Sequence, residues 1–160
     1  MPEKSLNELE AMVGESRVTV RDLDVERGKV AEFAAALGED DPVYRDREAA
    51  ADRGLDGIPA PLTFTQVGRF PRCQPDEFNE DKGIQGFNLG FDPQRTVHGE
   101  QEYEFERPVY VSDTLTGTTT LSDVYQRESG DDTLTFAVLT TEYRDDDELV
   151  VTERRTAIET

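Results

Sequence analysis

The second half of the chain alternates between two kinds of side chain, and this period of two constrains the fold more than any other feature. Within positions 97–107 every second residue from 100 to 106 is acidic and those between are not: Glu100, Glu102, Glu104 and Glu106 against Gln101, Tyr103 and Phe105. This is the pattern of a half-buried strand. Further β-rich runs at 113–127, 133–143 and 149–158 are separated by clusters of turn residues. The pattern predicts a meander of long antiparallel strands.

The first half has helical spacing instead. Asp24 can cap a helix that Gly38 ends, and its apolar positions are Val30, Phe33, Ala34 and Leu37. Shorter helices are expected over 5–13, 47–53 and 62–70, an extended lead-in over 18–20 and a long irregular connection over 71–95. Helices followed by an antiparallel meander predict an α+β fold whose sheet is covered on one face. With 160 residues, the chain is expected to form a single domain over 1–160.

The charge excludes several functions. The chain carries 36 acidic and 17 basic residues, a formal net charge of −19, and the acids are scattered along its whole length. Such a surface repels nucleic-acid phosphates and anionic membranes. Lys4, Lys29 and Lys82 are the only lysines. This composition predicts a halophilic protein, because molar salt shortens the Debye length to roughly 3 Å and removes the cost of self-repulsion.

Other sequence features bear on location and cofactors. There is no apolar run of about 18 residues and no secretory leader, so a cytoplasmic protein is expected. Cys73 is the only cysteine and His98 the only histidine, so no metal site is expected. The chain also lacks a dinucleotide-binding loop, a Walker sequence and a Gly-x-Ser-x-Gly elbow.

Several local motifs occur in an order that resembles one known family. The first two are Phe33-Ala-Ala-Ala-Leu-Gly-Glu-Asp-Asp-Pro-Val-Tyr44 and Pro59-Ala-Pro-Leu-Thr-Phe64; the others are His98-Gly-Glu-Gln101, Glu106-Arg-Pro108, Val111-Ser-Asp-Thr114 and Glu148-Leu-Val-Val151. Together they resemble the MaoC-like hydratase and dehydratase family, in its N-terminal or FAS1-like dehydratase branch. The resemblance implies a hotdog fold, in which an antiparallel sheet wraps around a helix. It also implies that two such units pair and that an acyl thioester enters a tunnel at their interface.

The resemblance also implies a catalytic loop, from which this chain departs. Catalytically complete members carry Gly-Asp-x-Asn-Pro-x-His, and hydration of a 2-enoyl thioester needs a base to activate water and a proton source. In this chain Glu39 takes the Asp position, Asp41 the Asn position and Tyr44 the His position. Glu39 can still act as a base, although its carboxylate lies one methylene further out. A tyrosine side chain ordinarily titrates near 10, so Tyr44 replaces imidazole poorly. The alternative is that 38–42 is only an acidic turn that ends a helix.

His98 is the third catalytic candidate, because any mechanism that uses imidazole requires it. A lone histidine at the start of a strand is more often a structural residue. Simple alternation places Glu100, and not Gln101, on the same face as His98.

Substrate-binding residues are expected in the motifs and in the cations beside them. The motif residues are Asp41, Pro61, Thr63, Phe64, Gly99 and Gln101. Arg69 and Arg72 are expected to hold the phosphates of coenzyme A or of a phosphopantetheine arm. Pairing with nearby surface acids is the alternative for both arginines.

These features favour a subunit of an (R)-specific enoyl-thioester hydratase or 3-hydroxyacyl-thioester dehydratase, with this chain as the acyl-binding half paired with a catalytic hotdog subunit. One alternative is a self-sufficient homodimeric hydratase that uses Glu39 or His98. Others are a hotdog thioesterase and a non-enzymatic protein that binds acyl thioesters. No cofactor is expected beyond the coenzyme A or phosphopantetheine that the substrate carries.

Overall fold

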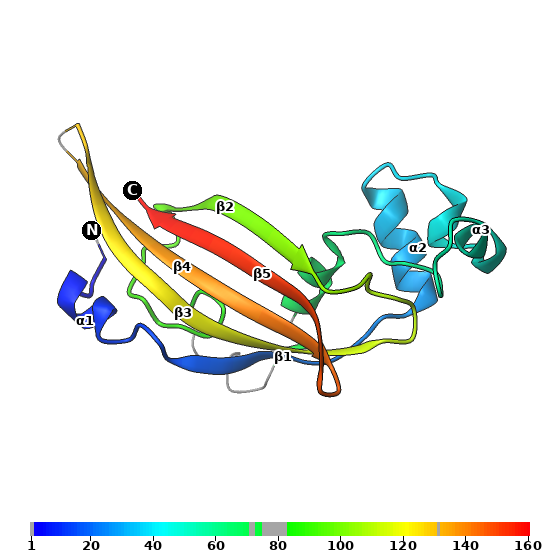
Figure 1. Ribbon diagram of the computed structural model, residues 1–160. Coiled ribbons are helices and arrows are strands. Elements are labelled where there is room, and N and C mark those ends of the chain that lie inside the picture. Colours follow the sequence, from blue (N-terminus) through cyan, green and yellow to red (C-terminus); the bar gives the residue numbers. More distant parts are fainter. Residues whose placement is uncertain (1, 71–72, 75–82, 131) are drawn as a thin grey trace.

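The computed structural model describes residues 2–70, 73–74, 83–130 and 132–160. A long, curved, five-stranded antiparallel sheet runs through it in the order β1-β3-β4-β5-β2, so β1 and β2 are the edges (Figure 1). The strands are β1 (Ser16–Asp24), β2 (Thr96–Phe105), β3 (Thr114–Ser129), β4 (Asp132–Asp145) and β5 (Glu148–Glu159). The predicted meander is present in β3, β4 and β5, but β2 does not belong to it, because β2 pairs with β5 and not with β3.

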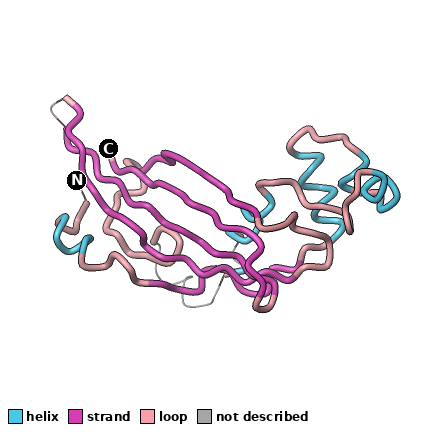
Figure 2. Tube along the Cα trace, viewed as in Figure 1, coloured by secondary structure: helices cyan, strands magenta, loops and turns pink. Residues whose placement is uncertain are grey.

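Except for one 3-10 helix that packs on a face of the sheet, the helices lie at its two ends, as the tube in Figure 2 shows. They are α1 (Leu6–Glu10), α2 (Arg27–Ala36), α3 (Arg47–Asp52) and the 3-10 helices η1 (Pro42–Tyr44) and η2 (Phe64–Arg69). Helices α2 and α3, with η1 between them in sequence, form a lobe beyond one end of the sheet, and α1 lies near the other end. We call residues 27–53 the lobe.

Helix η2 packs against one face of the sheet, which we call the inner face. Phe64 and Val67 of η2 share a buried cluster with Leu115 of β3, Tyr143 of β4 and Val151 of β5. Phe64 also meets Phe33 of the lobe edge to face, with ring centroids 5.6 Å apart. Phe64 thus connects the lobe to the sheet.

A second buried cluster lies towards the α1 end. It joins apolar residues of α1, of the connection after residue 83, and of strands β3 and β4: Leu9, Phe87, Leu89, Leu121, Val124, Ala137 and Leu139. Among the described elements, only β3 and β4 contribute buried side chains to both clusters. The sheet therefore carries two apolar centres along its length.

A β-bulge at Gly99 overturns the expected alternation of β2. His98 pairs with Ala157 and Glu100 pairs with Thr156, so Gly99 is an extra residue with no partner on β5. Beyond the bulge Gln101 pairs with Arg155, which places Gln101, and not Glu100, on the inner face with His98. The prediction that Glu100 shares the face of His98 is wrong, because simple alternation cannot anticipate an inserted residue.

The structure also corrects the start of the chain's first half. The lead-in predicted over 18–20 is the full strand β1, whose register shifts and left-handed Asp22 (φ 48°) hide any alternation. Asp24 ends β1 and does not cap α2, which begins after Glu26 without a side-chain cap. The helix predicted over 62–70 is the shorter η2. Gly38 does follow α2 in the left-handed conformation, with φ 79°.

Candidate functional site

A pocket with a volume of about 470 Å³ opens where the lobe meets the end of β2. This size is within the usual range for small-molecule sites. Its walls are mostly apolar and come from the lobe, from the proline-containing segment after it, and from the end of β2: Val43, Tyr44, Arg53, Leu55, Pro59, Ala60, Leu62, Phe105, Glu106, Arg107, Pro108 and Val109. Leu62 is 67% exposed, so apolar surface continues to the rim of the pocket.

Asp41 fixes the turn that brings Tyr44 to this pocket. Its carboxylate accepts from the backbone N–H of Val43 at 3.0 Å and pairs with Arg53 at 2.7 Å. The Val43 N–H, and secondly Arg53, hold the pKa of Asp41 below its ordinary value. Asp41 is therefore an ionised cap of η1.

Tyr44 is partly buried at the wall of the pocket. Burial raises the pKa of its phenol above 10.0, and the carboxylates of Glu39 and Asp41 raise it further. At neutral pH the phenol is therefore protonated. It can donate a hydrogen bond to an oxygen atom, but it cannot accept a proton from water.

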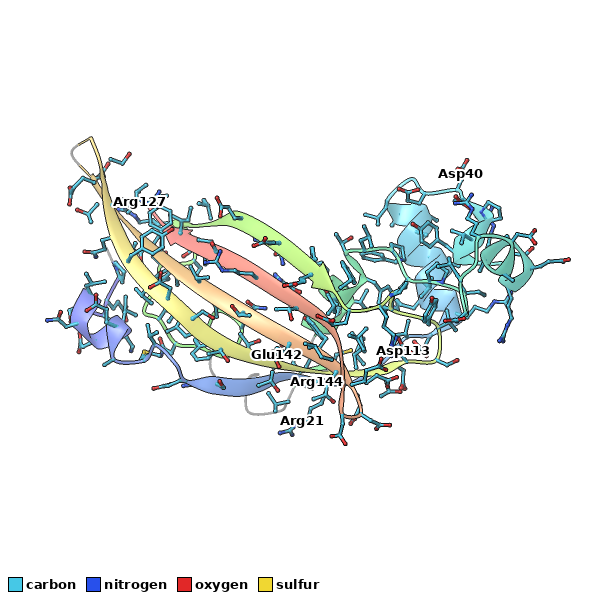
Figure 3. All side chains as sticks on the ribbon, viewed as in Figure 1. Arg21, Asp40, Asp113, Arg127, Glu142 and Arg144 are labelled. Carbon is cyan, nitrogen blue, oxygen red and sulfur yellow. The ribbon has the colours of Figure 1, made fainter. Side chains whose placement is uncertain are left out.

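Glu39 lies in the loop before η1 and is exposed. Its backbone N–H donates to the carbonyl of Ala34 at 2.9 Å and closes the end of α2. Its neighbour Asp40 lies at the outer edge of the lobe in Figure 3. Glu39 and Tyr44 are close enough to influence each other, but the Glu39 side chain is not among the groups that line the pocket.

Arg107 lines the sheet side of the pocket, and its guanidinium forms ion pairs with carboxylates. Its guanidinium contacts Asp113 at 2.7 Å, Asp145 at 3.3 Å and Glu148 at 3.1 Å. Asp113 is labelled in Figure 3 at the junction of the sheet and the lobe. This network joins the end of β2 to β3 and to the β4–β5 hairpin, so Arg107 is a structural cation.

His98 does not join this site. It lies near the start of β2, whereas the pocket lies beyond the strand's other end at Phe105. Seven residues at about 3.3 Å each, less the bulge, place His98 and Phe105 roughly 20 Å apart. Burial, and then the charges of Arg155 and Arg69, lower the pKa of His98 below 6.5. The three catalytic candidates therefore occupy two separate regions of the chain.

A second polar group of residues lies on the inner face, between η2 and β5. Glu153 is fully buried, and its carboxylate accepts from Arg69 at 2.5 Å and from the hydroxyl of Thr65 at 3.1 Å. Tyr143 donates to the same carboxylate at 3.4 Å. The prediction that Arg69 holds a phosphate remains a prediction, but in the structure its guanidinium is already paired.

Arg155 and Glu153 are the residues that sequence analysis missed. Both lie on the inner face of β5, where Arg155 pairs with Gln101 and Glu153 with Tyr103 of β2. The alternation of β5 could have revealed them, because it places both charged residues on the same face as the apolar Val151. Charge on the buried face of a strand indicates a paired or functional site.

The other predicted residues fall in several places. Pro61 is buried beside the pocket, Thr63 is half-buried at the start of η2, and Phe64 lies in the core. Gly99 forms the bulge. Gln101 lies on the inner face opposite Arg155, and we call Gln101, Arg155, Arg69 and Glu153 the inner polar region. Arg72 lies outside the described residues. In the described ranges, no three His, Cys, Asp or Glu side chains are grouped to hold a metal, and no helix is long and apolar enough to cross a membrane.

Comparison with known proteins places this geometry in context. The family model described as the FAS1-like dehydratase domain region matches residues 11–154. A UPF0336 protein of Streptomyces avermitilis is 36% identical over 115 residues, which is 72% of this chain and 72% of that protein. The C-terminally truncated HadBC (3R-hydroxyacyl-ACP dehydratase) complex from Mycobacterium tuberculosis has a similar chain, with a TM-score of 0.72, 28% identity, and coverage of 92% of this chain and 96% of that one.

A structure described as a MaoC-like dehydratase is also similar, with a TM-score of 0.69 and 26% identity. The match covers 94% of this chain but 43% of that longer chain. The architecture shared with these structures is the hotdog fold, as predicted.

Proposed function

The chain belongs to the FAS1-like dehydratase family, and on that premise we propose that it is the acyl-binding subunit of an (R)-specific enoyl-thioester hydratase or 3-hydroxyacyl-thioester dehydratase. A second hotdog subunit supplies the catalytic carboxylate and imidazole. The substrate is an acyl thioester of coenzyme A or of a phosphopantetheine arm, and no further cofactor takes part.

The pocket at Tyr44 carries this proposal. Its walls are apolar enough for an acyl chain, with Leu62 and Phe105 among them. The group at the position where complete family members place an imidazole is a phenol with a raised pKa. A protonated phenol can hydrogen-bond a thioester oxygen, but the step that activates water needs a base near neutral pH.

The comparisons support a paired assembly. HadBC is a complex of a 3R-hydroxyacyl-ACP dehydratase, and the MaoC-like dehydratase is long enough to hold a second unit beside the matched one. Two hotdog units, one with the catalytic pattern and one without it, are consistent with both.

The edge strand β2 favours a partner that is not a second copy of this chain. Glu100, Glu102 and Glu104 lie exposed along the outer face of β2, away from η2. If two copies paired antiparallel along this edge, glutamates would face glutamates, and like charges directly opposite each other are destabilising. A partner with basic residues along its own edge strand fits better.

The test is hydration of an enoyl-CoA by the purified chain in molar KCl, followed by absorbance. We expect binding of the enoyl-CoA by calorimetry, and no turnover above that of the Glu39→Gln and His98→Ala variants. Turnover that one of these variants abolishes would identify a self-sufficient enzyme and overturn the accessory role.

A second arm adds a hotdog subunit that has an intact Gly-Asp-x-Asn-Pro-x-His loop and is encoded beside this chain. Turnover that requires both proteins supports the proposal. Binding of the thioester without turnover in the mixture would favour the non-enzymatic alternative.

A further inference from the structure

The inner polar region contains more positive than negative charge around Arg155. The positive charge of Arg69 is balanced by its ion pair with Glu153. Among the residues that the structure describes, no carboxylate lies within ion-pair distance of Arg155. The charged and titratable groups that shift the pKa of Arg155 are Arg69, Glu153 and Tyr103.

Arg155 is held in an environment that disfavours its own charge. Burial lowers the pKa of its guanidinium, and repulsion by Arg69 lowers it further. The Glu153 carboxylate opposes this shift but makes no ion pair with Arg155. A partly buried cation without an ion-pair partner costs free energy, which an anion at this position would offset.

Hydrogen-bonding groups beside Arg155 also lack partners. Both polar atoms of the Gln101 side chain, and Nε of Arg155 and of Arg69, are buried without a hydrogen-bond partner within the described ranges. Buried polar atoms in folded proteins nearly always have one. Gln101 and Arg155 are cross-strand neighbours, so their unpartnered hydrogen-bond donors lie close together.

The same locality is open to solvent at one side. The Gly99 bulge places His98 and Gln101 on the same, inner face, where His98 is exposed. The charges of Arg155 and Arg69 are close enough to lower the pKa of His98. Strand β2 is an edge, so no further strand of this chain covers it. Although the molecule has a net charge of −19, these neighbouring cations favour an anion at this position.

We propose that Arg155, Gln101 and His98 form a binding site for the phosphate group of the thioester's carrier, with Arg69 behind them. The guanidinium fork and imidazole suit phosphate oxygens, and the Gln101 amide can donate a further hydrogen bond. Along β2 the site extends from Gln101 to His98, which lie roughly 13 Å and roughly 20 Å from the pocket wall at Phe105. This spacing suits a ligand whose acyl thioester and phosphate are separated by a long, extended arm. The identity of the ligand rests on the proposed function; the phosphate site itself does not.

The single histidine makes this site directly observable. Nuclear magnetic resonance of the His98 imidazole would be followed while inorganic phosphate, 4′-phosphopantetheine or coenzyme A is added at constant KCl concentration. We expect saturable shifts and a rise in the pKa of His98, because a bound anion favours the imidazolium. Coenzyme A binding at least tenfold more tightly than phosphopantetheine identifies coenzyme A as the carrier, and equal affinities identify the arm's own phosphate.

Arg155→Gln should weaken binding at least tenfold, and Arg155→Lys should weaken it less because the charge is kept. Arg154→Gln is the matched control, because Arg154 is exposed and pairs with Glu102 on the outer face. Circular dichroism establishes that each variant is folded. Shifts that do not saturate, or equal binding by Arg155→Gln and Arg154→Gln, would overturn the site.

None of these ligands contains an acyl group, so the result is independent of hydratase activity. Phosphate binding without any acyl-thioester turnover in the two-protein assay would count against the proposed function alone. Dimerisation with a partner that Arg155→Gln abolishes, without any phosphate binding, would instead assign Arg155 to the subunit interface and overturn the phosphate site.

Discussion

At the scale of single residues, the buried carboxylate of Glu153 depends on Arg69 for its charge balance. Arg69→Ala leaves Glu153 with only the hydroxyls of Thr65 and Tyr143 as partners. We expect a loss of about 2–3 kcal/mol of unfolding free energy, less than for a fully enclosed pair because Arg69 is 26% exposed. Urea denaturation at fixed KCl concentration measures this loss.

The double variant Arg69→Met with Glu153→Leu is the control for that experiment. Replacing a buried ion pair by apolar residues of similar size is often nearly neutral, so we expect most of the stability to return. A double variant as unstable as the single one would show that packing, and not an unpaired charge, causes the loss.

The pKa of His98 predicts a small dependence of stability on pH. Its folded-state pKa is lowered, so below about pH 6.5 the unfolded chain binds more protons at this position than the folded chain. The contribution of His98 is therefore complete above pH 6.5 and is lost as the pH falls towards the folded-state pKa. It should be small because the ring is largely exposed.

Urea denaturation between pH 5 and 8 checks this sign. The His98→Asn variant should show a shallower fall on the acid side than the natural chain. An identical pH dependence in both proteins would show that His98 titrates alike when folded and unfolded.

At the scale of elements, the bulge in β2 leaves little room for a side chain at Gly99. A Cβ on Gly99 would lie 2.7 Å from Cδ1 of Ile158 and 3.2 Å from the carbonyl of Thr156. Gly99→Val should therefore cost about 1–3 kcal/mol of unfolding free energy, measured by urea denaturation. Adding Ile158→Ala should recover part of that cost, and purely additive effects of the two changes would refute the steric explanation.

The glutamates of β2 predict how this edge associates. A charge-swapped chain with Glu100→Lys, Glu102→Lys and Glu104→Lys, mixed with the natural chain, should form a one-to-one dimer more tightly than either protein alone. Opposite charges then lie across the edge, and the difference should shrink as KCl rises. Sedimentation velocity measures both effects.

Lysine substitution of Asp146 and Asp147, in the exposed β4–β5 turn, is the control for a change of charge away from β2. It is compared with the double variant Glu100→Lys with Glu102→Lys, which changes the charge by the same amount. Natural protein that dimerises as tightly alone as in the mixture would show that β2 tolerates self-pairing.

The elements differ in how well the sequence predicts them. Strands β3 to β5 and helix α3 follow from local composition and turn residues, because their patterns are regular. Strand β1 does not, because its register shifts and left-handed Asp22 interrupt the pattern.

The candidate site divides in the same way. The loop with Glu39 and Tyr44 follows from local motifs. The group around Arg155 requires the bulge at Gly99 and the pairing of β2 with β5, and neither is visible in a single sequence.

At the scale of the whole molecule, the net charge of −19 predicts stability that depends on salt. Repulsion among scattered carboxylates opposes the compact state at low ionic strength and is screened in molar KCl. The melting temperature should therefore rise with KCl concentration, as followed by circular dichroism. Stability in dilute salt that equals or exceeds stability in molar KCl would contradict the halophilic assignment.

The two apolar centres described above have a consequence for how the molecule opens. A domain with two separate cores can unfold one end at a time unless the same elements pack into both cores. Here β3 and β4, with 16 and 14 residues, carry fully buried side chains into both centres. These two strands make the domain cooperative, and their central amides should be the last to exchange with deuterium.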